Sequence, residues 1–381
     1  MVQEQLNTRF WWWVSTCFSL MMITIIGIMW YVSDSDYSPN EHQLISMQSA
    51  ETALVIKLKE SNRYQNANKT FIPTGIFVQS LSFNNSNDVN VTGYIWQKYP
   101  KDNALPNPKK QAGFIFPEQV DSGSNISPKL IYEQIDDDEV TYGWYFESTL
   151  RQQFDYQKYP LDHKTVWIRI WPYDFDRSHY LLPSLDSYHS TSPGAPFGLD
   201  KNIVLGSWDI QETFYDYKVV DYDTNFGLAA NGRHQSYPEL YFNVVLKRRF
   251  LNSFIVEVVP LLTVATLLFS LVMTTSSDHE NKEFMGFDVN TIIAVVSALF
   301  FAVMLSHIHI REKFAGQGVV YIEYFFLIMY AQMIFIIVNT FIFANSKHIN
   351  IFTYENNILV KISFWPLMLF FMVIVTYIFL F

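Results

Sequence analysis

Ionisable side chains stand within or beside long apolar stretches of this chain, where charge is costly unless water or a partner is near. Glu257 and Glu323 lie close to the starts of two such stretches, and His307 and His309 lie at the far end of another. Such groups can take up and release protons, and imidazole does so near neutral pH. The pattern makes Glu257, His307 and His309 candidate proton sensors. The simpler expectation is that both glutamates reach the membrane interface and that the histidines are ordinary interface residues.

The sequence gives little support for thiol chemistry, metal binding or hydrolytic catalysis. Cys17 is the only cysteine and lies inside the first apolar stretch, so we expect no disulfide, zinc site or thiol nucleophile in the polar part of the chain. The acidic run 136–139 has no histidine or serine at a useful spacing and fits a calcium-binding loop better than a hydrolytic site. We therefore expect no enzyme activity and no cofactor, and we assign no metal ligand.

The net charge of the chain limits the kinds of partner that it can bind. The 36 acidic residues outnumber the 26 basic ones, for a net charge of −10, and no basic stripe is present to neutralise phosphates. Nucleic-acid binding is therefore not expected. An acidic surface suits the attraction of cations, although most surface charge serves only solubility.

Five apolar stretches are long enough to cross a bilayer as helices, for which about 20 residues suffice. The first, 10–32, is too long for a signal peptide and follows a single basic residue, Arg9. No small-x-small cleavage site comes after it, so we interpret it as an uncleaved anchor. Charge in the loops leaves the orientation nearly undecided. The other four stretches crowd the end of the chain, at 250–273, 289–310, 319–343 and 358–381.

A polar segment rich in strand patterns lies between the anchor and these four stretches. Its β-branched and aromatic residues alternate in part, between Asn, Asp, Gly and Pro residues, which predicts an antiparallel β-sandwich of the immunoglobulin-like kind. Ahead of it, the apolar residues of 41–64 favour a helix. The predicted organisation is a cytoplasmic tip and anchor (1–32), a linker with a helix (33–69), a sandwich (70–249) and a four-helix transmembrane bundle (250–381).

The segment 154–175 carries a distinctive pattern, FDYQKYPLDHKTVWIRIWPYDF. In its turn, Tyr159-Pro160-Leu161-Asp162, the proline fixes one φ angle and the aspartate can cap the turn. The segment resembles the signature loop of pentameric ligand-gated ion channels, the Cys-loop receptor superfamily. Animal members bracket this loop with two cysteines. This chain has neither, as in the prokaryotic branch.

Further matches follow in the family's order. The segment 71–99 resembles its first hairpin, 208–218 and 237–250 resemble its last two strands, and Pro260 matches a proline of its first channel helix. The resemblance implies a homopentamer in the cell (inner) membrane, with the sandwich on the extracellular or periplasmic side. The anchor and the helix after it are not part of the family's usual plan. The loop between the first two channel helices is also longer, and 311–317 lacks the usual proline.

The resemblance implies that 289–310 lines a pore. Residues at helical spacing on one face run from polar or small to bulky and apolar, as an ion path with an apolar gate requires. Glu283 and Asp288 at the inner mouth would form carboxylate rings that favour cations, or else they are ordinary loop charges. The pore-lining set is Asn290, Ala294, Ser297, Phe301, Leu305 and Ile308, and the last three are the candidate gate.

The family's ligand site lies between neighbouring sandwiches, under a hairpin that corresponds here to 221–236. Aromatic walls can hold a cation over their π-faces, although strand aromatics are more often core residues. The candidate walls are Trp144, Trp171, Tyr173, Tyr222 and Phe226. Coupling to the pore is expected where the sandwich base meets the loop after the pore helix, through an Arg–carboxylate pair. The coupling candidates are Tyr159, Pro160, Asp162, Arg249 and Arg311.

These expectations describe a homopentameric channel that selects cations and opens to an extracellular ligand or to protons. Its partners are the lipid bilayer, inorganic cations and a small ligand that no sequence feature identifies. The alternative is a non-conducting membrane receptor that uses the same fold to sense and to recruit partners.

Overall fold

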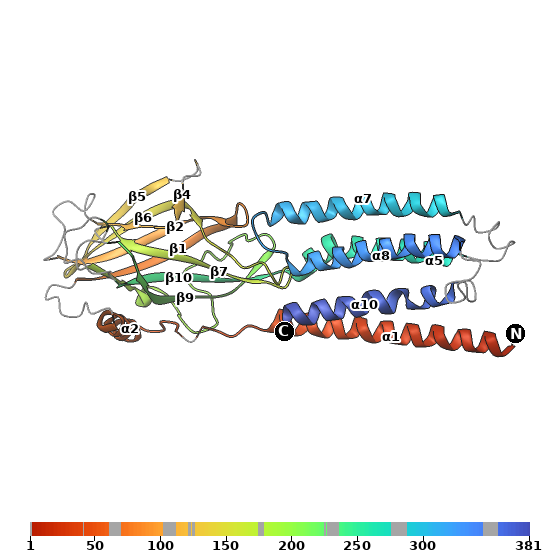
Figure 1. Ribbon diagram of the computed structural model, residues 1–381. Coiled ribbons are helices and arrows are strands. Elements are labelled where there is room, and N and C mark those ends of the chain that lie inside the picture. The colour runs from red at the N-terminus through yellow and green to blue at the C-terminus, as the bar shows by residue number, and fades with distance from the viewer. Residues whose placement is uncertain are drawn as a thin grey trace. The chain divides into compact units, whose positions relative to one another are not determined.

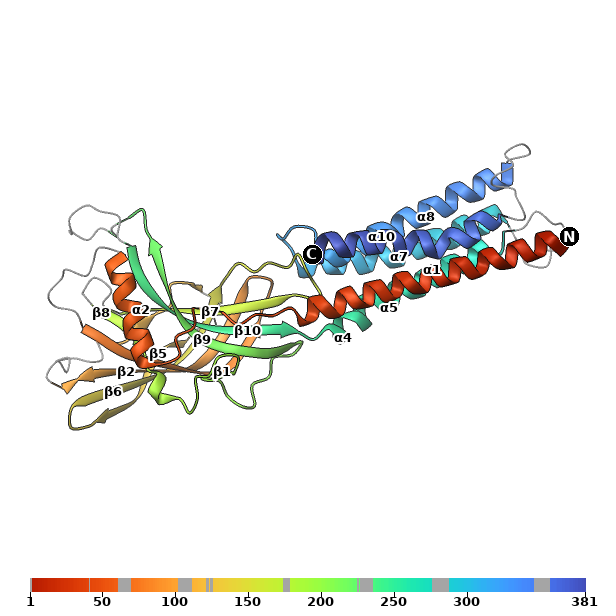
Figure 2. The ribbon, with the colours of Figure 1, turned by 90° about the horizontal axis from the view of Figure 1, so that it is seen from below.

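The computed structural model describes residues 2–40, 42–60, 70–101, 112–120, 123, 126–173, 179–224, 226, 236–275, 288–345 and 357–381. The chain forms two compact units, drawn in Figure 1 and Figure 2. The helical unit contains Met1–Tyr37, Asp155–Asp162 and Arg249–Phe381, and the strand unit contains Ser38–Phe154 and His163–Arg248. The short segment Asp155–Asp162 thus interrupts the strand unit in sequence but belongs to the helical unit.

Two sheets make up the strand unit (Figure 1), which confirms a β-rich domain with two sheets. The larger has the order β4-β6-β2-β1-β8, with β5 also paired to β6. Its strands are β1 (Thr70–Phe83), β2 (Asp88–Pro100), β4 (Gln119–Val120), β5 (Ile126–Ile135), β6 (Glu139–Arg151) and β8 (His179–Pro183). The smaller sheet has the order β3-β7-β10-β9. Its strands are β3 (Phe114–Ile115), β7 (His163–Pro172), β9 (Trp208–Asp221) and β10 (Ser236–Arg248).

Alternating side chains fill the space between the two sheets. Along β7, Val166, Ile168 and Ile170 are buried and the residues between them are less so, as expected for a strand with one face on a core. Phe114 of the smaller sheet contacts Phe146 of the larger one, with ring centroids 6.1 Å apart. Burial of this apolar surface is the main force that holds the sheets together.

One strand pairing differs from the antiparallel sandwich that we expected. β8 lies parallel to β1, from His179 opposite Thr70 to Pro183 opposite Thr74. A parallel partner has to arrive by a crossover rather than by a tight hairpin. β8 can do so because β7, the strand before it in sequence, belongs to the other sheet. The pairs β1–β2, β2–β6, β7–β10 and β9–β10 are antiparallel, as expected.

The helix expected in the linker forms over Met47–Glu60 (α2), so it begins later than the predicted residue 41, and residues 61–64 lie outside the described part of the chain. Side chains just before and inside its first turn set its start. The Ser49 N–H donates to the Ser46 Oγ at 3.2 Å, and the Ser46 N–H donates to the Ser49 Oγ at 2.9 Å. This reciprocal capping satisfies N–H groups that the helix itself cannot bond.

Among the described residues, five helices are long and apolar enough to cross a membrane (Figure 1). This finding confirms the expected number of spans and indicates a membrane-embedded protein with a separate β-rich domain. α7 continues past the predicted end at 310, which places Arg311 on the helix. The spans are α1 (Val2–Ser35), Phe250–Met273 with α4 (Phe250–Ser253) and α5 (Val259–Met273), α7 (Val289–Lys313), α8 (Tyr321–Asn345) and α10 (Ile358–Leu380).

The span Phe250–Met273 is not a regular α-helix. Phe254–Val258 forms a π-helical turn between α4 and α5, and the Val259 N–H donates to the Phe254 carbonyl. Pro260 follows directly and has no N–H to continue the bonding pattern of an α-helix. The wider turn is the local solution to that missing donor.

Shortening a side chain on the buried face of α2 tests whether apolar packing holds this helix in place. Leu54 is 1% exposed, whereas Ile56 on the same helix is 49% exposed. Leu54→Ala should lower the free energy of unfolding by about 2–5 kcal/mol, because it removes buried methyl groups and leaves a cavity. Ile56→Ala should change it by less than about 0.5 kcal/mol. Thermal melts of the purified variants check this, and equal melting temperatures would contradict it.

Candidate functional site

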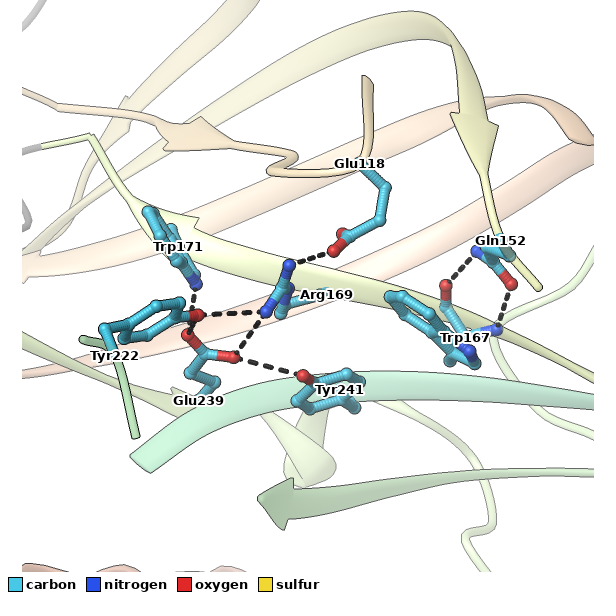
Figure 3. Close-up of polar contacts among 8 residues, drawn as sticks. All are labelled: Glu118, Gln152, Trp167, Arg169, Trp171, Tyr222, Glu239 and Tyr241. Atoms are coloured by element: carbon cyan, nitrogen blue, oxygen red, sulfur yellow. Dashed lines mark hydrogen bonds and ion pairs between the residues drawn. The ribbon is translucent and has the colours of Figure 1, made fainter. Parts of the chain in front are cut away.

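An ion network centred on Arg169 lies inside the strand unit (Figure 3). Arg169 is on β7, Glu239 is on β10, and Glu118 directly precedes β4. The guanidinium donates through Nη1 to Glu239 Oε2 at 3.0 Å and through Nη2 to Glu118 Oε1. The side chain of Glu239 is 0% exposed and that of Arg169 is 17% exposed. We call Glu118, Arg169 and Glu239 the Arg169 network.

Glu239 accepts hydrogen bonds from four side chains. Besides Arg169, its Oε1 accepts from the indole Nε1–H of Trp171 at 2.8 Å and from the hydroxyl of Tyr222. Its Oε2 also accepts from the hydroxyl of Tyr241, at 3.0 Å. These donors replace the water that a buried carboxylate loses. They also tie β7, β10 and the residue after β9 to one acceptor (Figure 3).

Burial and pairing shift the proton affinities in this region. Burial raises the pKa of Glu118 above its usual range, although its hydrogen bond with Arg169 acts in the opposite direction. Burial works against the charge on Arg169, but the hydrogen bond to Glu118 and the charge of Glu239 together raise the pKa of Arg169. Burial and the hydrogen bond to Glu239 raise the pKa of Tyr222, so its hydroxyl keeps the proton that it donates.

Three aromatic side chains stand beside the network, and we call them the aromatic group. The ring centroids of Trp171 and Tyr222 lie 5.8 Å apart, those of Trp171 and Phe226 lie 6.1 Å apart, and those of Tyr222 and Phe226 lie 5.4 Å apart. Phe226 is 47% exposed. The network has two carboxylates and one guanidinium, and so carries one net negative charge. Negative charge behind accessible π-faces suits a small organic cation.

The aromatic group contains three of the five residues predicted to form ligand walls. Trp144 lies elsewhere, buried in the core with its ring 6.1 Å from that of Phe114. Tyr173 is 54% exposed, and its N–H donates to the Gly113 carbonyl. Most of the hairpin tip within 221–236 lies outside the described residues.

The Arg169 network is not among the sites expected from the sequence. Arg169 carries the only charge in the apolar strand pattern TVWIRIW, and a charge on a half-buried strand needs a partner. That signal could have pointed to Arg169 itself. It could not have pointed to Glu118 and Glu239, which lie 51 and 70 residues away in sequence.

A second cluster of polar and aromatic side chains lies in the helical unit, where the turn Asp155–Asp162 packs against the helices. Tyr159 is 0% exposed, and its ring contacts Phe314 with centroids 4.6 Å apart. Its hydroxyl accepts from Lys313 Nζ at 2.8 Å and donates to Glu257 Oε1 at 3.2 Å. Lys313 ends α7, and Glu257 lies in the π turn before α5. We call Tyr159, Glu257, Lys313 and Phe314 the turn cluster.

Further bonds hold the turn to the other helices of this unit. The Tyr321 N–H at the start of α8 donates to the Gln157 carbonyl at 2.8 Å. Lys158 Nζ donates to the carbonyl of the last residue of α10 at 3.3 Å. Pro160 and Asp162, two of the predicted coupling residues, are buried in the same turn. The turn therefore contacts α7, α8, α10 and the span that contains α5.

Glu323 is the centre of a third cluster, close to the start of α8. It accepts from the Val320 N–H at 2.7 Å and from Arg311 Nη1 at 3.1 Å. Its Oε1 lies 3.3 Å from His307 Nε2, and His307 Nδ1 lies 3.2 Å from the hydroxyl of Tyr330. These contacts join α7 to α8 through one carboxylate. We call them the Glu323 cluster.

Glu257 and Glu323 are buried within the helical unit, and their expected position at the membrane interface stays a prediction. They are 4% and 1% exposed, because cationic and hydroxyl partners inside the unit replace water. Arg311 pairs with Glu323, and Arg249 is exposed at the start of α4. Their role in coupling stays a prediction. Lys313 is not among the residues expected from the sequence, because its position in the last turn of a long helix gives no sign of its partner Tyr159.

The predicted pore residues all lie on the exposed side of α7. Phe301, Leu305 and Ile308 are 59, 64 and 44% exposed. The exposed residues toward the other end of the helix are Asn290, Ala294 and Ser297. The side that packs within the helical unit carries the buried Ile292, Val296, Val303 and Ile310. α7 therefore separates a packed side from a side that its own unit leaves uncovered.

The other predicted residues near α7 lie at its two ends. Asp288 caps the start of the helix by accepting from the Thr291 N–H at 3.0 Å. Its neighbour in the prediction, Glu283, lies outside the described residues. At the other end, His309 is exposed.

The described part of the chain offers no group of three or more His, Cys, Asp or Glu side chains that could hold a metal ion. The acidic run 136–139 lies where β5 turns into β6, and Glu139 pairs there with Lys98 at 3.4 Å. A calcium-binding role for this run stays a prediction.

No known protein-family model matches this chain, and no curated protein matches it.

Removing the guanidinium tests the Arg169 network. Arg169→Met leaves Glu118 and Glu239 buried without their cation, which should lower the free energy of unfolding at pH 7 by about 3–5 kcal/mol. Burial already raises the pKa of Glu118, and the loss of Arg169 removes the hydrogen bond and the charge that act in the opposite direction. The folded state therefore takes up protons first as the pH falls, and the deficit should shrink from pH 7 to pH 5. Tryptophan-fluorescence melts of the purified protein measure this.

The matched control is Arg151→Met. The Arg151 side chain is 61% exposed where it pairs with Asp88, so its loss should lower the free energy of unfolding by much less than the loss of Arg169 does. Its pairing lowers the pKa of Asp88, so that smaller deficit should persist at pH 5. An Arg169→Met deficit that is equally large at pH 7 and pH 5 contradicts the assignment.

A double-mutant cycle tests the turn cluster. Tyr159→Phe keeps the ring on Phe314 but removes the hydroxyl between Lys313 and Glu257, and Lys313→Met removes the cation. Because both changes break the same 2.8 Å hydrogen bond, their effects on the free energy of unfolding should be non-additive by about 0.5–3 kcal/mol. Melts of the two single variants and the double variant measure the coupling. Strictly additive effects would show that the two side chains act independently.

Proposed function

We propose that this chain is one subunit of a homopentameric, cation-selective ion channel that opens to a small extracellular ligand or to protons. One observation carries the proposal. α7 turns its six predicted pore residues away from its own unit, and Lys313 at the end of the same helix holds Tyr159 of the turn. Such a helix can both line a shared path and be moved from its end. The Tyr159–Asp162 motif, which resembles the signature loop of pentameric ligand-gated channels, supports the same assignment.

In a ring of five copies, the uncovered side of α7 faces a common axis. Phe301, Leu305 and Ile308 then form apolar rings that close the path by dewetting. Asp288, together with Glu283, supplies carboxylate rings at the other mouth that favour cations. The strand unit lies on the extracellular or periplasmic side of the cell membrane, and an overall charge of −10 assists cation entry.

The aromatic group, with the Arg169 network behind it, is the proposed ligand site. Arg169 lies on β7, which begins at His163 directly after the turn, and Glu239 lies on β10, which ends at Arg248 and is separated from α4 only by Arg249. Their salt bridge therefore joins the two strands that lead into the helical unit. A cation bound over the aromatic faces competes with Arg169 for Glu239 and so biases both strands together.

Protons are the other stimulus, and the Glu323 cluster is the proposed place where they act. A protonated imidazole at His307 would hold Glu323 more strongly than a neutral one, because a cation then faces the carboxylate. Protonation of Glu323 has the opposite effect and releases Arg311. Each event changes how α7 is attached to α8, the neighbouring helix. The groups that face this site are Arg311, His307, Glu323 and Tyr330.

Phe301→Ala is the direct test of the gate. The purified full chain is placed in a planar bilayer and current is recorded over a range of pH values, first without added ligand. Loss of the Phe301 ring should leave the pore leaky at pH values where the wild type is closed, because the apolar constriction widens. Phe300→Ala is the matched control, since the Phe300 ring packs on Tyr330 with centroids 5.3 Å apart. It should leave the closed state tight.

The result also separates the two classes of function. If the wild type and Phe301→Ala pass no current at any pH, with or without small organic cations, the channel proposal fails. A non-conducting membrane receptor with the same fold is then the better assignment.

A further inference from the structure

An apolar cavity of about 290 Å³ lies inside the helical unit, between α1 and the helices of the C-terminal bundle. α1 supplies Ile23, Ile26, Gly27 and Trp30, and the rest of the wall comes from the span Phe250–Met273, α8 and α10. α1 is packed along α10, where the Ser15 hydroxyl donates to the Ile362 carbonyl at 2.6 Å. The cavity therefore exists only because α1 covers this side of the bundle.

The side chains of the wall are apolar apart from the indole N–H groups of two tryptophans, Trp30 and Trp365. The others are aliphatic, aromatic and methionine side chains. The polar group of Trp30 is already used, because its indole N–H donates to the hydroxyl of Tyr321 at 2.8 Å. That hydroxyl in turn shares a 2.7 Å hydrogen bond with Thr376. An apolar cavity of this kind excludes water and accepts apolar guests.

Gly27 marks the place where α1 leaves room. A glycine in the middle of a helix is destabilising relative to alanine, so it needs a reason to be there. A Cβ added at Gly27 would meet no atom within 4 Å, so no neighbouring group of the protein requires its absence. Gly27 is exposed, and Ile23 one turn away is 52% exposed, so the cavity is open to the surroundings on this side. The missing side chain keeps that opening wide.

We propose that α1 and the bundle together form a binding site for one hydrocarbon chain of a membrane phospholipid. The five helices place this cavity within the depth of a bilayer, where the surrounding solvent is hydrocarbon chains. The wall is elongated along the helices, since Ile23 and Trp30 are about 10 Å apart along α1. An empty apolar space of this size costs stability, and a chain that enters through the opening restores the lost contacts. The site does not depend on ion conduction.

Photo-crosslinking tests this site in the full chain. The protein is reconstituted in nanodiscs of phosphatidylcholine that carries a diazirine in the middle of one acyl chain, irradiated, digested and analysed by mass spectrometry. Met368 and Met372 line the cavity and are buried, so a label on them reports a chain inside it. Leu20 on α1 is 59% exposed and reports the surrounding lipid. The wild type should be labelled at all three residues.

Gly27→Leu places a side chain at the opening, where its Cβ meets no atom within 4 Å, and should reduce labelling of Met368 and Met372 by on the order of tenfold, while Leu20 stays labelled. The matched control is Ile28→Phe, because Ile28 is 58% exposed and lies outside the wall. It should leave all labels unchanged. Gly27→Ala provides a smaller change that favours the helix and should give an intermediate reduction.

Three outcomes overturn the proposal. The first is equal labelling of Met368 and Met372 in the wild type, Gly27→Ala and Gly27→Leu. The second is a wild type labelled at Leu20 but not at the two methionines, which means that the cavity is empty or holds a small apolar molecule instead of a lipid chain. The third is a loss of label in Ile28→Phe as large as that in Gly27→Leu, because the effect is then a general disturbance of α1.

Discussion

A carboxylate taken out of water has to be met by cations or hydrogen-bond donors, since the desolvation of an unpaired charge costs several kcal/mol. Both units of this chain are arranged around such groups. In the strand unit, Glu239 accepts hydrogen bonds from residues on β7, on β10 and directly after β9. In the helical unit, Glu257 accepts from Tyr159 of the turn, and Glu323 accepts from Arg311 on α7. Each carboxylate thereby fixes the relative positions of segments that are far apart in sequence.

If the chain is the channel subunit that we propose, polar contacts and not only apolar packing lie where a signal would have to pass. Apolar surfaces can slide or repack at modest cost, whereas a buried ion pair has few alternative arrangements. Arg169 with Glu239, and Tyr159 with Lys313 and Glu257, are therefore suited to two discrete states rather than to continuous adjustment. Aromatic rings beside both clusters exclude water and keep these interactions strong.

Much of this architecture was predictable because the relevant signals are local. A bilayer requires long apolar runs, so the five helices stand out, and half-buried strands alternate, so the β-rich unit does too. The uncovered side of α7 follows from helical periodicity. The partners of the charged residues were not predictable, since Lys313 is 154 residues from Tyr159 and no local pattern connects them. The parallel direction of β8 likewise depends on which sheet the preceding strand joins.

The π turn at Phe254–Val258 has a consequence for helix register. A π turn adds one residue to a helical turn, and each residue of an α-helix advances by about 100° around the axis. The residues before the π turn therefore point in different directions around the helix axis than they would if the span were one uninterrupted α-helix. Glu257 lies within this insertion, so its direction toward Tyr159 is set by the extra residue and not by the apolar pattern of the span. If the segment formed a regular α-helix, the Glu257 carboxylate would point away from Tyr159. A change between the π turn and a regular helix would therefore rotate one part of this span relative to the other.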